Sequence, residues 1–162
     1  MTLTTSSVAA LDAVLSPKSA WNAESVARFL AGCCLPLRIA TTDAAGYPHV
    51  TSLWFEFADG RFLCCTQRTA LVARHLRARP RAGFEIAVNE PPYRGLSGQA
   101  DAALVDVDAL ALLERLTARY LEGRDPKLRR WLLSRAATEV VIELQPRRIT
   151  SWDFGRRMSA AD

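Results

Sequence analysis

Two short helices are predicted within residues 1–35, where apolar positions recur at helical spacing. The first helix has its apolar positions around Leu11 and is interrupted at Pro17. The second begins after Asn22, because an asparagine side chain can accept a hydrogen bond from the first turn of a helix. Gly32 is the type of residue that ends such a helix.

After this segment the apolar positions alternate with polar ones, which is typical of strands. Asp43–Gly46 is predicted to be a turn, and Asp59-Gly60 is a strong hairpin signal. Gly95 and Gly98 lie inside one expected strand, where glycine marks a bulge, a bend or a close approach. The expected strands cover residues 36–42, 47–57, 61–65, 81–88, 93–105, 139–144 and 147–154, with a turn at 145–146 between the last two.

Three further helical segments separate these strands. A short helix is predicted over Thr69–Ala78, a longer one from a cap at Asp106 to about Glu122, and a shorter piece after Asp125. Strands and helices do not alternate regularly, so a parallel nucleotide-binding sheet is not expected. The order predicts a mainly β (α+β) protein, a six- to seven-stranded antiparallel split β-barrel with peripheral helices.

The expected organisation is one barrel domain with short additions at both ends. Residues 1–35 form a helical segment that packs on the barrel, residues 36–158 form the barrel, and residues 159–162 form a tail. A chain of 162 residues is long enough for one such domain.

The net charge of +4 comes from arginine, since Lys18 and Lys127 are the only lysines. Basic residues cluster between Arg68 and Arg81, and such a cluster can receive an anionic ligand. No recognisable nucleic-acid-binding motif accompanies the cluster, so no nucleic-acid partner is expected.

The hydropathy of the chain gives no membrane signal. No apolar run reaches the roughly 20 residues that a spanning helix needs. Met1–Ala10 has no basic residue ahead of an apolar core, as a signal peptide would have. We therefore expect no membrane partner and a cytoplasmic location.

The four cysteines occur as two adjacent pairs, Cys33–Cys34 and Cys64–Cys65, without the spacing that brings two sulfurs onto one metal. They are interpreted as small buried thiols, and a four-cysteine zinc site is the minor alternative. The sequence carries none of the motifs of serine hydrolases, zinc proteases or phosphate-binding loops. It therefore predicts no metal site and no catalytic side chain.

The order and spacing of several short motifs are more specific than any one of them alone. Together the motifs resemble the pyridoxamine 5′-phosphate oxidase-like superfamily of FMN-binding split barrels, in particular its small flavin/deazaflavin oxidoreductase branch. The motifs, together with Thr66, are LRIATT (37–42), DAAGYPHV (43–50), SLWF (52–55), DGRFL (59–63), ARHL (73–76), RPRAG (79–83), PPYRG (91–95) and RITSWDF (148–154).

The resemblance implies a homodimer with a cofactor groove at the interface between the two barrels. The segment Val50–Trp54 would line the flavin ring, Thr66–Leu76 would hold the phosphate, and the partner would add contacts. The cofactor-binding residues implied in this way are Val50, Thr51, Ser52, Trp54, Thr66, Gln67, Arg68, Thr69, Arg74, Arg94 and Trp152.

The phosphate segment departs from the family pattern of a serine and basic residues, because this chain has Ala70, Leu71 and Val72 there. Each lost charge-assisted contact costs roughly 1.5–3 kcal/mol. Arg68 and Arg74 lie nearby and are the hypothesised replacements, because arginine grips phosphate oxygens with two donors.

The leading hypothesis is an FMN-binding oxidoreductase that transfers hydride to or from an unknown small substrate, with the cofactor carrying the redox chemistry. A deazaflavin coenzyme is the alternative of the same class, favoured by the strand tryptophan Trp54. A second hypothesis is a non-catalytic binder of haem or another planar ligand, with His49 or His75 as the iron ligand. A third is a structural dimer without a ligand.

Overall fold

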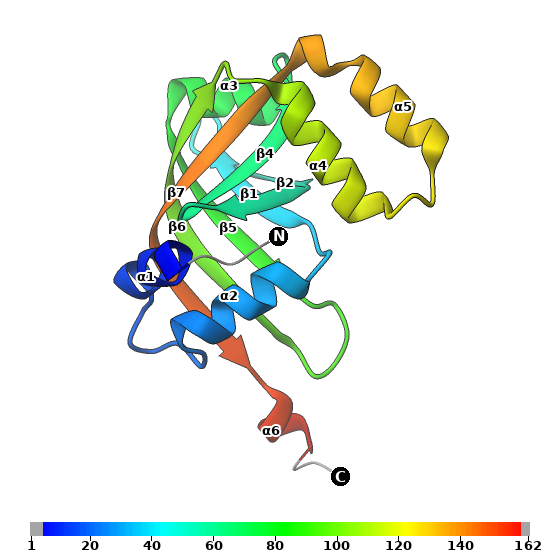
Figure 1. Ribbon diagram of the computed structural model, residues 1–162. Helices are drawn as coiled ribbons and strands as arrows, with labels where there is room; N and C mark the ends of the chain where they lie inside the picture. Colours follow the sequence, from blue (N-terminus) through cyan, green and yellow to red (C-terminus); the bar gives the residue numbers. More distant parts are fainter. Residues whose placement is uncertain (1–4, 160–162) are drawn as a thin grey trace.

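The structure of the protein, a computed structural model, describes residues 5–159 (Figure 1). Of the expected tail, residues 160–162 lie outside this range. The helices are α1 (Thr5–Val14), α2 (Ala23–Gly32), α3 (Leu71–Ala78), α4 (Ala109–Leu121), α5 (Pro126–Ser134) and α6 (Gly155–Ser159). The strands are β1 (Leu37–Thr42), β2 (Pro48–Leu53), β3 (Phe55–Ala58), β4 (Arg61–Gln67), β5 (Arg81–Ala87), β6 (Arg94–Val105) and β7 (Glu139–Asp153).

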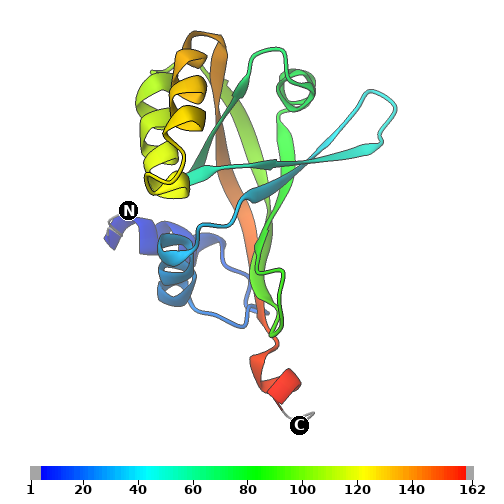
Figure 2. The ribbon, with the colours of Figure 1, turned by 90° about the vertical axis from the view of Figure 1, so that its right-hand side faces the viewer.

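The seven strands form one antiparallel sheet in the order β2-β1-β5-β6-β7-β4-β3. The sheet curls into a half-barrel, and α4 and α5 lie together on one side of it while the β1–β2 hairpin projects on the other (Figure 2). This strand-rich α+β half-barrel confirms the predicted fold class.

The expected single strand over residues 47–57 is wrong, because the chain there forms β2 and β3 at opposite edges of the sheet. Leu53 pairs with Leu37 of β1, whereas Phe55 pairs with Cys64 of β4. Only Trp54 separates the two strands, so it is the point where the chain crosses from one edge to the other. The alternation of apolar positions continues through this point, and it therefore gives no sign that the pairing partner changes.

The expected turn at residues 145–146 is also wrong, because β7 runs unbroken through Pro146. Pro146 pairs with Ala100 and Arg148 pairs with Gln99, so Arg147 is an extra residue on β7. A proline cannot donate to the ladder, but next to such a bulge the ladder is already interrupted.

The helix starts are set by individual side chains. Asn22 caps α2 as predicted, since its Oδ1 accepts from the backbone N–H of Ser25 at 2.9 Å. The cap of α4 is Asp108 and not Asp106, because only the carboxylate of Asp108 accepts from the first turn. Asp106 instead forms an ion pair with Arg68.

The core fills the concave side of the half-barrel and the space beneath α2 and α4. Its largest fully buried side chains include Phe55, Phe62, Leu30 and Leu116. Each such side chain contributes about 1.5–3 kcal/mol through burial. The chain after α1 joins β7, where the backbone N–H of Ser16 donates to the carbonyl of Ile149 at 2.7 Å and ties the N-terminal helices to the sheet.

Candidate functional site

A cavity of about 360 Å³ lies where the chain crosses from β2 to β3, and we call it the crossover groove. This volume is within the range of small-molecule sites. The β2–β3 junction, the end of β4 and the start of β7 form one wall, and α4 and α5 form the other. The lining residues are Ser52, Leu53, Trp54, Cys65, Thr66, Gln67, Leu113, Leu116, Leu128, Trp131, Leu132, Arg135 and Glu139.

Four of the residues predicted from the sequence meet in this groove: Ser52, Trp54, Thr66 and Gln67. They come from two segments on β strands that are separated by a hairpin. The curling of the sheet brings them together, because the β2–β3 junction and the end of β4 both face α4.

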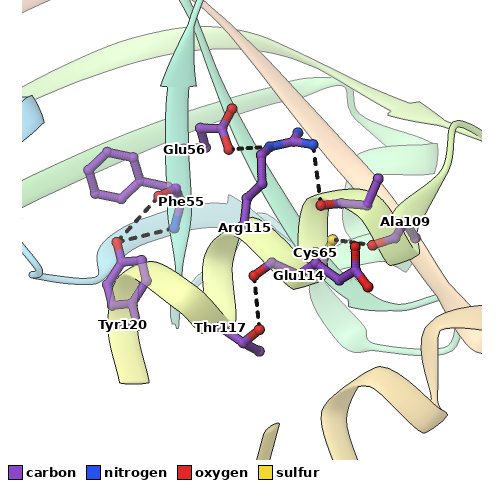
Figure 3. A network of polar contacts seen from close by, with 9 residues as sticks. Phe55, Glu56, Cys65, Ala109, Glu114, Arg115, Thr117 and Tyr120 are labelled. Carbon is purple, nitrogen blue, oxygen red and sulfur yellow. Dashed lines mark hydrogen bonds and ion pairs between the residues drawn. The ribbon is translucent and has the colours of Figure 1, made fainter. Parts of the chain in front are cut away.

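Tyr120 of α4 fixes the crossover point from beneath (Figure 3). Its hydroxyl accepts from the backbone N–H of Phe55 at 3.2 Å and donates to the carbonyl of Leu35 at 3.0 Å. The Trp54 ring stacks on the Tyr120 ring at 5.1 Å with an interplanar angle of 7°. Burial raises the pKa of Tyr120 to about 12, so its hydroxyl stays neutral and works as a hydrogen-bond bridge.

Two further contacts hold α4 on the strands below it (Figure 3). The Nε of Arg115 donates to Glu56 of β3 at 2.7 Å, and the Sγ of Cys65 donates to the carbonyl of Ala109 at 3.9 Å. Burial raises the pKa of Cys65 to about 12, so this thiol is protonated at neutral pH and is a poor nucleophile. Cys65 is therefore a structural thiol at the floor of the groove.

Replacing Tyr120 with phenylalanine is expected to lower the free energy of unfolding by about 1–3 kcal/mol. The change leaves the N–H of Phe55 and the carbonyl of Leu35 without their shared partner. Urea unfolding measures the difference. Tyr47→Phe is the matched control, because Tyr47 is 72% exposed, and its effect should stay within about 0.5 kcal/mol. Equal effects of the two changes would contradict the bridging role of Tyr120.

The outer wall of the groove is α5, which the sequence analysis did not connect with the site. Leu128, Trp131 and Leu132 lie on one face of this helix and line the groove, although Trp131 remains 53% exposed. The Arg135 guanidinium lies 4.5 Å from the centre of the Trp131 ring. The sequence does contain a pattern that could have indicated this wall: residues 128, 131, 132 and 135 have the spacing of one helix face.

A carboxylate lines the groove at the start of β7, and the sequence analysis missed it as well. The Oε1 of Glu139 accepts from the side-chain amide of Gln67, and the hydroxyl of Thr138 donates to the carbonyl oxygen of that amide at 2.9 Å. Glu139 is only 9% exposed. Burial raises its pKa above the usual range of a glutamate, while Gln67 and the nearby charge of Arg135 act in the opposite direction.

The segment expected to hold a phosphate forms the turn between β4 and α3. Ala70 precedes α3 and supplies no side-chain cap to the first turn. The backbone N–H groups of that turn are consequently open to an anion. Leu71 is 38% exposed, whereas Val72 is buried in the core, so neither replaces the basic residues of the family pattern.

The two arginines hypothesised to replace those residues differ in their surroundings. Arg68 forms an ion pair with Asp106, and its carbonyl accepts from Arg77 at 2.8 Å. Arg74 lies exposed on α3, and its side chain has no hydrogen bond or ion pair with the residues that the structure describes. Arg74 is therefore the guanidinium of this segment that can turn to a ligand without breaking an existing contact.

Comparison of the sequence with protein-family profiles shows the family to which the chain belongs. The sequence profile of pyridoxamine 5′-phosphate oxidase matches residues 24–153. The chain belongs to the pyridoxamine 5′-phosphate oxidase family. No curated protein matches the chain in sequence.

Several solved structures share the fold of this family member at low sequence identity. The conserved hypothetical protein Rv2991 from Mycobacterium tuberculosis is 22% identical, with a TM-score of 0.71 over 90% of this chain and 92% of its own. An F420 reductase is 22% identical, with a TM-score of 0.61 over 75% and 93%. HutZ, the haem storage protein from Vibrio cholerae, is 22% identical, with a TM-score of 0.59 over 78% and 91%.

The remaining residues predicted for the site of this family member lie outside the crossover groove. Val50 is 60% exposed on β2. Thr51 points to the other face of that strand, where its hydroxyl lies 3.3 Å from the Nδ1 of His49. Thr69 is exposed in the turn before α3.

Arg94 and Trp152 lie at the opposite end of the sheet from the groove. β7 runs from Glu139, which pairs with Gln67, to Trp152, which pairs with the residue after Arg94. Thirteen residues of extended strand separate the two ends by roughly 40 Å. Within one protomer Arg94 and Trp152 therefore cannot reach a ligand in the groove.

The two histidines form a pair between β2 and α3. The rings of His49 and His75 meet edge to face at 5.8 Å, and the Nδ1 of His75 lies 3.0 Å from the hydroxyl of buried Thr41. This pair helps to seat α3 on the sheet. Within residues 5–159 no cluster of three or more histidine, cysteine or acidic side chains could hold a metal ion. Across the same residues, no helix is long and apolar enough to cross a membrane.

Proposed function

We propose that this protein binds FMN as a homodimer and acts as an oxidoreductase on a small substrate. The flavin ring occupies the crossover groove, and the phosphate lies at the N-terminus of α3. The observation that carries the proposal is the convergence of Ser52, Trp54, Thr66 and Gln67, four residues expected to contact cofactor, on one apolar groove. Membership of the pyridoxamine 5′-phosphate oxidase family supports it independently.

The residues of the groove fit the ring of a flavin. Trp54, Trp131 and several leucines provide flat apolar walls, and Gln67 and Glu139 provide polar atoms at one end. A planar ring with one hydrogen-bonding edge matches this distribution. Bound flavin supplies the hydride chemistry, and the protein holds the ring and excludes water from it.

The residues for the phosphate fit less fully, since Ala70, Leu71 and Val72 supply no cation and the N–H of Ala70 already donates to the carbonyl of Gln67 at 2.9 Å. The backbone N–H groups of Leu71 and Val72 are what this stretch offers an anion. Arg74 is proposed as the cation that compensates, with Arg68 and Thr69 beside it in the preceding turn. The side chain of Val50 is proposed to contact the ligand from the open side of the groove, and Thr51, which points to the other face of β2, through its backbone groups. Arg94 and Trp152 are proposed to act on the groove of the partner subunit, because they cannot reach their own.

A deazaflavin coenzyme is the alternative ligand, because its ring has the same shape and polar edge. An F420 reductase shares the fold, as does a haem storage protein, so both ligands belong in the test. Direct titrations of the purified dimer with FMN, the deazaflavin coenzyme and haem separate the three. Ligand fluorescence reports the first two, and Soret absorbance reports haem.

The proposal predicts saturable FMN binding with one site per protomer. Tighter binding of the deazaflavin would identify the deazaflavin, and not FMN, as the cofactor, and the groove would remain its proposed site. Absence of saturable binding for both flavins would overturn the proposed function, and a Soret band on haem addition would then support the non-catalytic alternative.

A further inference from the structure

Besides Ser52 and Thr66, three further polar residues line the crossover groove, next to the start of β7. Gln67 ends β4, Glu139 begins β7 opposite it in the ladder, and Arg135 lies four residues before Glu139. The Gln67 amide and the Arg135 guanidinium are donors, whereas an ionised Glu139 carboxylate is an acceptor only. Together these three side chains offer a ligand in the groove both hydrogen-bond donors and an acceptor.

Glu139 keeps binding capacity for a ligand. One carboxylate oxygen accepts from Gln67, and no other hydrogen bond or ion pair to this carboxylate is formed by the residues that the structure describes. Glu139 nonetheless lines the groove, and the residue as a whole is only 9% exposed. The carboxylate can therefore accept a further hydrogen bond from a donor on a ligand in the groove.

The Gln67 amide is held in one orientation. The carboxylate of Glu139 only accepts, so the amide nitrogen is the end that faces it, and the amide oxygen lies 2.9 Å from the Thr138 hydroxyl, which also lies 2.8 Å from the carbonyl of Arg135. This nitrogen carries two hydrogens, and Glu139 uses one of them. The other remains available to an acceptor on the ligand.

We propose that Gln67, Glu139 and Arg135 recognise the imide edge of a flavin or deazaflavin ring. An imide presents carbonyl, N–H and carbonyl in sequence, which is an acceptor, a donor and an acceptor. Glu139 accepts from the central N–H, while Gln67 and Arg135 donate to the two carbonyl oxygens. This inference rests on the proposed function and adds to it the orientation of the ring, with its imide edge at the start of β7.

The test uses lumiflavin and 3-methyllumiflavin, which are ring probes without a phosphate. Their affinities for the whole protein are measured by fluorescence quenching near pH 8. Methylation of the imide nitrogen removes the donor for Glu139, so 3-methyllumiflavin is expected to bind about 10-fold more weakly. In the variant Glu139→Leu the two probes should bind equally, whereas Glu143→Leu, the same change four residues along β7, should keep the 10-fold difference.

A pH series on the unaltered protein tests the same inference without a variant. The groups near Glu139 are the Arg135 guanidinium and the thiol of Cys65, and Cys65 stays neutral between pH 4 and 8 because burial raises its pKa to about 12. Because burial raises the pKa of Glu139 as well, the carboxylate takes up a proton on acidification before an exposed glutamate would. A neutral carboxyl group accepts more weakly than a carboxylate, so the preference for lumiflavin should weaken as the pH falls.

The outcomes separate the inference from the proposed function. Saturable FMN binding with equal affinity for the two lumiflavins at pH 8 would overturn the imide contact and leave the proposed function in place. Absence of binding by FMN and by both probes would overturn the proposed function, and the imide contact with it. A preference for lumiflavin that survives both Glu139→Leu and acidification would assign recognition of the imide to other residues.

Discussion

Replacing Gly98 with alanine is expected to lower the free energy of unfolding by about 2–3 kcal/mol and the Tm by about 5–10 °C. A Cβ at this position would lie 2.3 Å from the carbonyl oxygen of Arg148 and 2.5 Å from the Phe84 ring. Gly98 pairs with Ile149 of β7 and precedes the bulge at Gln99 and Ala100. Neither the backbone oxygen nor the buried ring can move away without disturbing the core.

Gly83→Ala is the matched control for this change. Gly83 pairs with Gln99 on the neighbouring strand β5, but a Cβ there would meet only ordinary contacts, the nearest at 3.7 Å from Ala40. Its effect should stay within about 0.5 kcal/mol. Thermal unfolding of both variants measures the difference, and equal stability of the two would contradict the packing described for the bulge.

Replacing Arg74 with alanine is expected to weaken FMN binding about 10- to 100-fold while leaving riboflavin binding unchanged. A charge-assisted hydrogen bond to phosphate contributes about 1.5–3 kcal/mol, and riboflavin has the same ring without the phosphate. Arg74 lies in the first turn of α3, beside the uncapped N–H groups. Parallel fluorescence titrations with the two flavins measure the loss.

Arg124→Ala removes the same charge from an exposed position after α4 and should leave both affinities unchanged. A double variant with Arg68→Ala and Arg74→Ala tests whether Arg68 contributes to FMN binding despite its ion pair with Asp106. If the double variant binds FMN as tightly as the unaltered protein, neither arginine replaces the basic residues missing from the phosphate segment.

Much of the fold could be predicted because local chemistry decides it. Asn22 caps α2, and Asp59 and Gly60 both have the positive φ angles of a tight hairpin turn, as their residue types predict. The crossing at Trp54 could not be predicted, because alternation tells which face a side chain occupies and not which strand pairs with it. The same limit applies to Pro146. It is tolerated inside β7 because the pairing with β6 is interrupted by the bulge next to it, and a pattern within one strand does not show that pairing.

The candidate site was predicted only in part for a related reason. The resemblance to the family supplied Thr66 and Gln67, which lie on β4, and Trp54, which lies between β2 and β3. Trp131 and Glu139 belong to the segment that follows α4, and the motifs of the resemblance do not reach it. Their role depends on the way α5 lies over the end of β4, which is a matter of packing between distant segments.

A crystal structure of the protein soaked with FMN tests the central claim most directly. We predict density for the flavin ring in the crossover groove, between Trp54 and Trp131, with the imide edge at Glu139 and the phosphate at the N-terminus of α3. A ring bound elsewhere on the half-barrel, or a groove without flavin density at a saturating FMN concentration, would contradict the account.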